Sequence, residues 1–237
     1  MASLNPAATR TVPIVALDVS GVGDALRLVD ELGDRCRFYK VGNELFTAVG
    51  PSVVREIRDR GADVFLDLKF HDIPNTVAGG VRNAARMGAR LVTVHAAGGL
   101  AMVRAAVEAG GESCGVLAVT VLTSLEAADI AAAWGRTDSL AIPGEVLRLA
   151  ELSAAASAHG IVCSGREASS VHERFGERLA ILVPGVRRSG GASHDQARVA
   201  TPREAMEAGA RYIVVGRMVT AAPDRCAAMD QVLRDLA

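Results

Sequence analysis

Eight short apolar segments recur along the chain at nearly regular intervals, and this rhythm constrains the fold more than any other feature. Most are continuous apolar runs without polar alternation, which is typical of parallel strands buried on both faces of a sheet. Stretches with helical spacing lie between them, as in residues 24–32, 52–60 and 76–87. The predicted strands cover residues 14–17, 38–41, 64–68, 91–94, 116–121, 160–163, 181–183 and 212–215.

Strands that alternate with helices over eight units favour an α/β fold, a single (β/α)8 barrel (a TIM barrel) of parallel strands. An open, doubly wound sheet is the alternative. We expect one catalytic domain over residues 13–237 and a flexible N-terminal arm over residues 1–12. The connections at 124–142 and 186–200 are longer than the others. Long loops in a compact domain are typical of binding loops or lids.

The composition argues against several classes of protein. The formal net charge is -1, with acidic and basic residues interspersed, so we expect no nucleic-acid partner. No apolar run approaches the roughly 18 residues that cross a bilayer, and the opening residues lack the apolar core of a signal peptide. The four cysteines are scattered, without metal-site spacing, and suit a reducing compartment. We therefore predict a cytoplasmic protein without membrane contact.

Lysine is almost absent from the chain. Lys40 and Lys69 are the only lysines among 26 basic residues, and each stands at the polar end of a predicted strand. Arginine stays protonated, whereas lysine is a compact ammonium that can release a proton. The retention of lysine at two such positions indicates a chemical role.

The second lysine lies in a charged segment, DLKFHD, at residues 67–72. Side chains two positions apart on a strand share a face, so Asp67 and Lys69 are predicted to point into the barrel. Asp18 and Lys40, at the ends of the first two strands, should reach the same mouth and give a cluster of alternating sign. A protonated lysine there can stabilise a developing anion and give it a proton. A purely structural ion-pair network is the alternative.

Glycine and arginine follow the last two predicted strands. The eighth ends in Gly216-Arg217, and the seventh leads into PGVR at residues 184–187. Glycine lets backbone N–H groups approach an anion, and arginine adds a bidentate fork. In many barrels the loops after these two strands bind phosphate. We therefore predict a phosphorylated small-molecule substrate.

The histidines differ in position. His95 stands at the end of a predicted strand, and we expect it to form a wall of the site. The others are predicted to lie on loops or helix surfaces, and they are His71, His159, His172 and His194.

The segment FLDLKFHDIPNT, at residues 65–76, resembles the signature of the orotidine 5′-phosphate decarboxylase family. The resemblance extends from Ile14 to the last helix through further blocks in the same order. These blocks are ALD at 16–18, KVG at 40–42, VHA at 94–96, TVLTS at 120–124, PGVR at 184–187 and VGR at 215–217.

The resemblance implies decarboxylation of orotidine 5′-phosphate to uridine 5′-monophosphate and carbon dioxide, the last step of de novo pyrimidine nucleotide synthesis. It implies that the reaction needs no cofactor and no metal. It also implies a homodimer, in which Asp72 and Thr76 reach the site of the neighbouring subunit.

The resemblance also assigns roles within the site. Lys69 would protonate C6 of the pyrimidine, and Asp67 would face the departing carboxylate. Asp18 and Lys40 would hold the ribose hydroxyls, and Lys40 and Asp72 would complete the catalytic set. The remaining substrate contacts implied are Ile73, Thr76, Thr123, Ser124 and Pro184, with Arg187, Gln196, Gly216 and Arg217 on the phosphate.

Two other functions stay open from the residues alone. A magnesium-dependent sugar-phosphate decarboxylase or aldolase of the same superfamily would need converging carboxylates. Lys40 stands at the end of the second predicted strand, where such a metal enzyme would need an acidic residue, and this cation argues against the metal-dependent function. A non-catalytic barrel that binds phosphometabolites would not need the alternation of acids and lysines.

Overall fold

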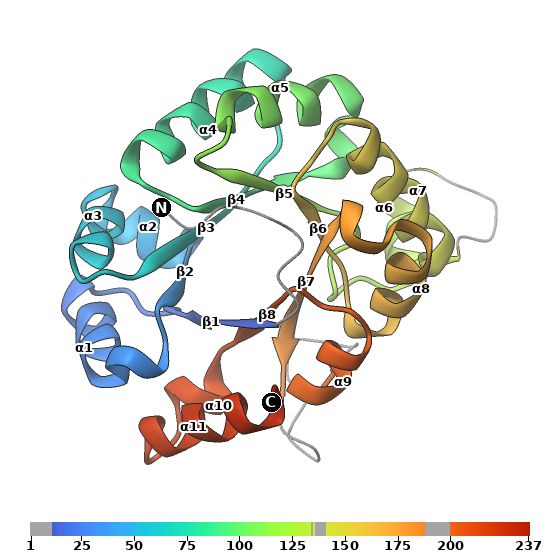
Figure 1. Cartoon of the computed structure of the whole chain (residues 1–237). Coiled ribbons are helices and arrows are strands. Elements are labelled where there is room, and N and C mark those ends of the chain that lie inside the picture. Colours follow the sequence, from blue (N-terminus) through green and yellow to red (C-terminus); the bar gives the residue numbers. More distant parts are fainter. Residues whose placement is uncertain (1–10, 134, 136–140, 188–199) are drawn as a thin grey trace.

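The structure is a computed structural model that describes residues 11–133, 135, 141–187 and 200–237. Eight parallel strands form a closed barrel in sequence order, and β1 pairs with both β2 and β8 (Figure 1). This closure confirms the predicted (β/α)8 barrel, and the open-sheet alternative is wrong. The strands are β1 (Val12–Ala16), β2 (Phe38–Gly42), β3 (Asp63–Phe70), β4 (Leu91–His95), β5 (Gly115–Val119), β6 (Gly160–Val162), β7 (Ala180–Val186) and β8 (Tyr212–Val215).

Helices surround the barrel (Figure 1). The helix predicted at 76–87 begins earlier, at Pro74, because proline suits the first turn, where its missing N–H is not needed. No helix in the described residues is long and apolar enough to cross a membrane. The α-helices are α1 (Val22–Leu32), α2 (Asn43–Val49), α3 (Ser52–Asp59), α4 (Pro74–Met87), α5 (Leu100–Gly110), α6 (Ala127–Ala133), α7 (Ile142–Ala155), α8 (Gly165–Phe175), α9 (Pro202–Glu207), α10 (Arg217–Thr220) and α11 (Arg225–Asp235), and the 3-10 helices are η1 (Gly33–Arg35), η2 (Ala96–Gly98) and η3 (Gly176–Arg178).

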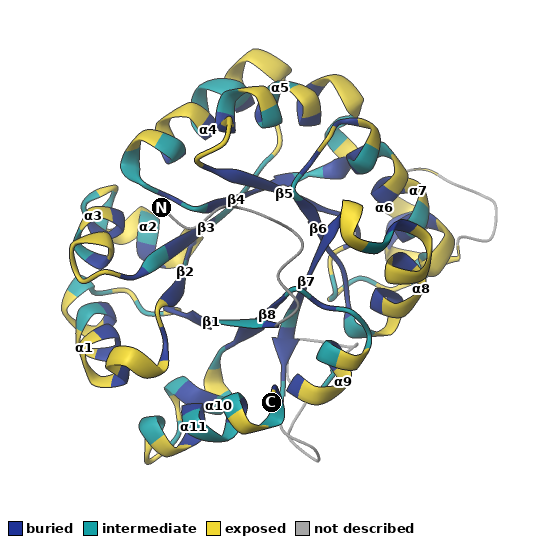
Figure 2. Ribbon diagram, viewed as in Figure 1, coloured by how far each residue is buried: buried dark blue, intermediate teal, exposed yellow. Residues whose placement is uncertain are grey.

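The apolar core has two layers, one inside the barrel and one between the strands and the helices. Along β1, Ile14 and Ala16 belong to the inner layer and Val15 belongs to the outer one. Most strand residues are therefore buried, as Figure 2 shows for the barrel wall. Burial on both faces explains why the strand sequences lack polar alternation.

Of the predicted N-terminal arm, the structure describes Thr11 and Val12. Val12 begins β1, and the Thr11 hydroxyl donates a 2.7 Å hydrogen bond to the carbonyl oxygen of Ala210. Residues 1–10 lie outside the described residues, so the arm and the domain boundaries stay predictions.

Aromatic rings pack at the end of the barrel opposite the mouth. Phe38 and Tyr212 meet edge to face with centroids 6.3 Å apart, and His159 Nε2 lies 3.1 Å from the Tyr212 hydroxyl. His159 lies in a loop, as predicted, but its ring is half-buried rather than exposed. Burial, followed by the charges of Arg90 and Arg211, lowers the pKa of His159 from 6.5 to about 4.

We expect His159 to make the stability of the fold depend on pH. The folded ring stays neutral down to about pH 4, whereas the unfolded ring takes up a proton near pH 6.5. The unfolded state therefore binds more protons between these values, so this contribution is fully present above pH 6.5 and falls by about 3 kcal/mol as the pH drops toward 4. His159→Gln should flatten the pH dependence of Tm across this window, and the exposed control His172→Gln should not. A His159→Gln curve parallel to that of the wild type would contradict the assignment.

Candidate active site

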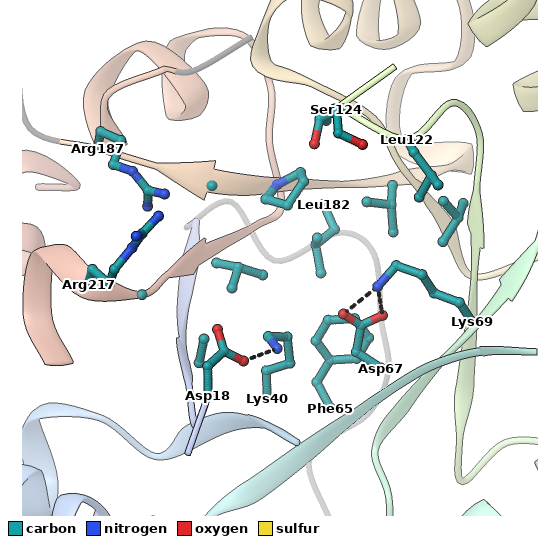
Figure 3. A pocket seen from close by; sticks show the side chains of 18 of the residues that line it. Asp18, Lys40, Phe65, Asp67, Lys69, Leu122, Ser124, Leu182, Arg187 and Arg217 are labelled. Atoms are coloured by element: carbon teal, nitrogen blue, oxygen red, sulfur yellow. Dashed lines mark hydrogen bonds and ion pairs between the residues drawn. The ribbon is translucent and has the colours of Figure 1, made fainter. Parts of the chain in front are cut away.

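A cavity of about 510 Å³ opens at the C-terminal ends of the strands, where the predicted mouth lies. The inner barrel layer forms its apolar floor, with Ala16, Phe65, Val119, Val162, Leu182 and Val214. Most of the predicted site residues line this one cavity (Figure 3). They are Asp18, Lys40, Asp67, Lys69, Thr123, Ser124, Pro184, Arg187, Gly216 and Arg217.

Two ion pairs stand side by side on the floor of the cavity (Figure 3). Lys40 Nζ lies 2.7 Å from Asp18 Oδ1, and Lys69 Nζ lies 2.8 Å from both carboxylate oxygens of Asp67. The side chains of Lys40 and Asp67 are only 12% and 14% exposed. Because a charge this deeply buried is costly without a partner, each pair must hold together.

The backbone at Lys69 departs from regular strand geometry. The register between β3 and β4 shifts between Leu66 and Phe70, and within this bulge Lys69 has a φ of 50°. Such a left-handed conformation costs a non-glycine residue about 1–2 kcal/mol. Thr93 of β4 contacts both charged residues of the bulge: the Lys69 N–H donates to its hydroxyl oxygen at 2.9 Å, and its hydroxyl donates to Asp67 Oδ1 at 2.9 Å.

Two arginines occupy the side of the cavity away from Lys69. Figure 3 shows the guanidinium groups of Arg187 and Arg217 turned toward each other. Beside them, a Cβ added to Gly216 would meet only the Cβ of Ala16, at 4.0 Å. The space where a side chain would stand is therefore open, and it allows a ligand to approach the backbone. Two facing guanidinium groups suit a doubly charged anion such as phosphate.

Three predicted site residues lie outside the cavity lining. Asp72, Ile73 and Thr76 are exposed around the start of α4, and Ile73 is 66% exposed. The Ile73 N–H donates a 2.6 Å hydrogen bond to Asp72 Oδ1. Gln196 lies outside the described residues.

His95 does not line the cavity, so its prediction as a wall of the site is wrong. Its ring packs against that of His71, with centroids 5.4 Å apart. Burial, then the neighbouring His71 and Lys69, lowers the pKa of His95 below its usual value. This shift in pKa favours the neutral form of the ring.

Sequence reasoning missed Thr93 and the residues of the cavity floor. The floor residues are apolar, so nothing in their type distinguishes them from other core residues. Thr93 has one sequence signal, because it is the only polar side chain in the otherwise apolar run LVTV at residues 91–94.

The arrangement favours proton transfer and anion binding over metal chemistry. The carboxylates of Asp18 and Asp67 each face an ammonium group rather than one another. Within the described ranges, no group of three or more acidic, histidine or cysteine side chains is placed to hold a metal ion.

A closed barrel with this charged mouth is the architecture of a (β/α)8 barrel enzyme. Comparison with known proteins makes the class specific: residues 11–232 match the family model "Orotidine 5'-phosphate decarboxylase / HUMPS family". The chain belongs to this family.

Curated relatives cover nearly the whole chain. An orotidine 5′-phosphate decarboxylase of Alkalilimnicola ehrlichii is 50% identical over 94% of this chain and 95% of its own length. One from Anaeromyxobacter dehalogenans is 56% identical over 80% of this chain and 82% of its own. Among solved structures, the orotidine 5′-phosphate decarboxylase of Lactobacillus acidophilus is similar with a TM-score of 0.83 and 35% identity, over 96% of this chain and 99% of that one.

Proposed function

We propose that this chain decarboxylates orotidine 5′-phosphate to uridine 5′-monophosphate and carbon dioxide, the last step of de novo pyrimidine nucleotide synthesis. Family membership and the names of the relatives support this reaction. The observation that carries it is the Lys69 ammonium, held by both oxygens of Asp67 in the same cavity as two facing arginines.

The distribution of charge suggests how the substrate binds. The 5′-phosphate would lie between Arg187 and Arg217, beside the backbone of Gly216. Asp18 and Lys40 would hold the ribose hydroxyls, and the pyrimidine would extend over the apolar floor toward Lys69. Thr123 and Ser124, which line the cavity after β5, would contact the ribose or the ring, and Pro184 would contact the nucleotide from the end of β7.

The chemical step needs a cation beside C6. When the bond between C6 and the carboxyl carbon breaks, its electron pair stays on C6, in the ring plane, where the π system cannot delocalise it. The Lys69 ammonium stabilises this carbanion and gives it a proton, and solvent then reprotonates the amine. Asp67 would face the departing carboxylate and keeps the ammonium in place through its two 2.8 Å contacts.

The family description names HUMPS beside orotidine 5′-phosphate decarboxylase. The family match alone therefore does not separate the decarboxylase from the metal-dependent alternative. A metal-dependent enzyme of the superfamily would need an acid at the end of β2, where this chain has Lys40 paired with Asp18. That ion pair and the names of the relatives favour the decarboxylase.

An assay with orotidine 5′-phosphate and a metal chelator tests the function. We expect loss of orotate absorbance at a rate that the chelator does not change. Lys69→Ala should lower this rate by at least about 10²–10³-fold while uridine 5′-monophosphate still binds, because the ammonium acts mainly on the developing charge. Activity lost with chelator and restored by Mg²⁺ would favour the metal-dependent alternative. Nucleotide binding without turnover would favour a non-catalytic barrel.

Arg217→Ala tests the phosphate end. Binding energy from a remote phosphate can be expressed in the transition state as well as in the ground state. We expect kcat/KM for orotidine 5′-phosphate to fall by at least about 30-fold, or about 2 kcal/mol, since a charged hydrogen bond is lost. The phosphate-free nucleoside should be almost unaffected. Arg234→Ala, at an exposed arginine on α11, is the control and should change neither rate. Equal losses on both substrates would contradict a phosphate role.

A second copy of the chain is proposed to complete the site. Asp72 and Thr76 are exposed and lie outside the lining of their own cavity, next to the exposed apolar side chain of Ile73. The family resemblance implies that these residues enter the neighbouring subunit's site. The cytoplasmic location stays a prediction from the use of cysteine.

Mixing two inactive variants tests the shared site. In a heterodimer of Lys69→Ala and Asp72→Ala subunits, one site carries both lesions and the other carries neither. Random exchange makes about half of the dimers mixed, so activity should reach roughly a quarter of the wild-type value. Lys69→Ala mixed with Asp67→Ala is the matched control and should recover nothing, because both residues serve their own subunit. Mixed dimers, identified by mass spectrometry, that recover no activity in the first experiment would contradict the shared site.

A further inference from the structure

We infer that Thr93 is a positioning residue for the reaction, because its single hydroxyl holds both the backbone of Lys69 and the carboxylate of Asp67. This inference rests on the proposed function, since it assumes that the Asp67–Lys69 pair performs the chemistry. The cavity lining does not include Thr93, so it acts through its two neighbours rather than on the substrate.

The hydrogen bonds of Thr93 have fixed directions. The Thr93 hydroxyl oxygen accepts from the Lys69 N–H at 2.9 Å and lies 2.9 Å from Asp67 Oδ1. An ionised carboxylate can only accept, so the one hydroxyl hydrogen points at Asp67. The side chain has no exposed surface, and water therefore does not compete for either bond.

Thr93 also lies opposite the bulge in β3. The pairing runs from Leu66 with Val92 to Phe70 with Val94, so three residues of β3 face the single residue Thr93. Within this bulge Lys69 has a φ of 50°, a conformation that non-glycine residues rarely adopt. The Thr93 side chain accepts from the Lys69 N–H at the position where this conformation occurs.

The bulge directs the lysine side chain. With the backbone held by Thr93, Lys69 Nζ reaches both oxygens of Asp67 at 2.8 Å. One hydroxyl thus orients the carboxylate and anchors the residue that carries the ammonium. The rate of a reaction falls steeply when a catalytic group is misplaced. Loss of this anchor should therefore lower the rate of the chemical step more than it weakens substrate binding.

Packing alone does not account for a threonine at this position. The neighbouring β4 residues Leu91, Val92 and Val94 are apolar and fully buried. Valine has the same branched shape and would fill the space without a hydroxyl that must be satisfied. The hydroxyl is therefore explained by its two contacts.

Thr93→Val and Thr93→Ser test the inference, with Thr120→Val as the matched control. Thr120 is also a buried threonine at the end of a strand, but its hydroxyl donates to the Val162 carbonyl at 2.8 Å and does not contact the charged cluster. For each variant we would measure kcat and KM with orotidine 5′-phosphate, the Kd of uridine 5′-monophosphate, and Tm.

We expect Thr93→Val to lower kcat on the order of 10- to 100-fold while the Kd of uridine 5′-monophosphate changes less than about threefold. Thr93→Ser, which keeps the hydroxyl, should have most of the wild-type kcat. Thr120→Val should lower Tm by about as much as Thr93→Val does, yet keep kcat within about twofold of the wild type. A Thr93→Val variant with wild-type kcat, or equal kcat losses in Thr93→Val and Thr120→Val, would overturn the inference.

Two further outcomes are separable. If Thr93→Val does not fold, Thr93→Cys replaces it. A cysteine side chain is close to serine in size, but its thiol forms only weak hydrogen bonds. The kcat should then fall in Thr93→Cys but not in Thr93→Ser. If both keep wild-type kcat, Thr93 does not position the pair. If the wild type does not decarboxylate orotidine 5′-phosphate, both the proposed function and this inference are wrong. If the wild type is active and Thr93→Val is equally active, only the inference is wrong.

Discussion

The pairing of Lys69 with Asp67 is the interaction on which the site depends. Asp67 is nearly buried, and a buried carboxylate is tolerated only with a partner, so the lysine must lie beside it. The closed barrel supplies the apolar floor beneath the pair, where an electrostatic contact is stronger than in water. The bulge in β3 and the hydroxyl of Thr93 supply the geometry. The residues proposed for the chemistry, Asp67 and Lys69, therefore lie two positions apart on β3, within the bulge that sets their geometry.

The two sides of the cavity carry different cations, and the proposed function gives them different tasks. Arginine is a planar fork that does not give up its proton, so Arg187 and Arg217 suit holding an anion without reacting with it. Lys69 can release a proton, which suits the reacting carbon. Under the proposed function, this division explains why a chain that uses arginine almost everywhere has its two lysines at the mouth of the barrel.

Much of the fold was predictable because strand burial has a direct sequence signal. Continuous apolar runs gave all eight strands of the barrel, within a few residues at their ends. Four ends differ by two or three residues: β1 begins earlier, at Val12, β3 continues to Phe70, β7 continues to Val186, and β5 stops earlier, at Val119. The segment after β5 lines the cavity instead of extending the strand.

The charged residues were predictable because buried charges at strand ends are rare. The bulge was not, since a lysine with positive φ has no sequence signature and arises from tertiary contacts. Thr93 is a common strand residue, and its role becomes visible only when β3 and β4 are placed side by side. The half-buried ring of His159 likewise depends on packing against Tyr212, far away in the sequence.

A crystal structure of the chain with uridine 5′-monophosphate tests the central claim most directly. The account predicts the 5′-phosphate between Arg187 and Arg217, and Lys69 Nζ within about 3.5 Å of C6, the distance of a near-attack arrangement. It also predicts Asp72 from a second copy of the chain at the same nucleotide. A phosphate bound at Asp18 and Lys40, or a pyrimidine ring out of reach of Lys69, would contradict the account.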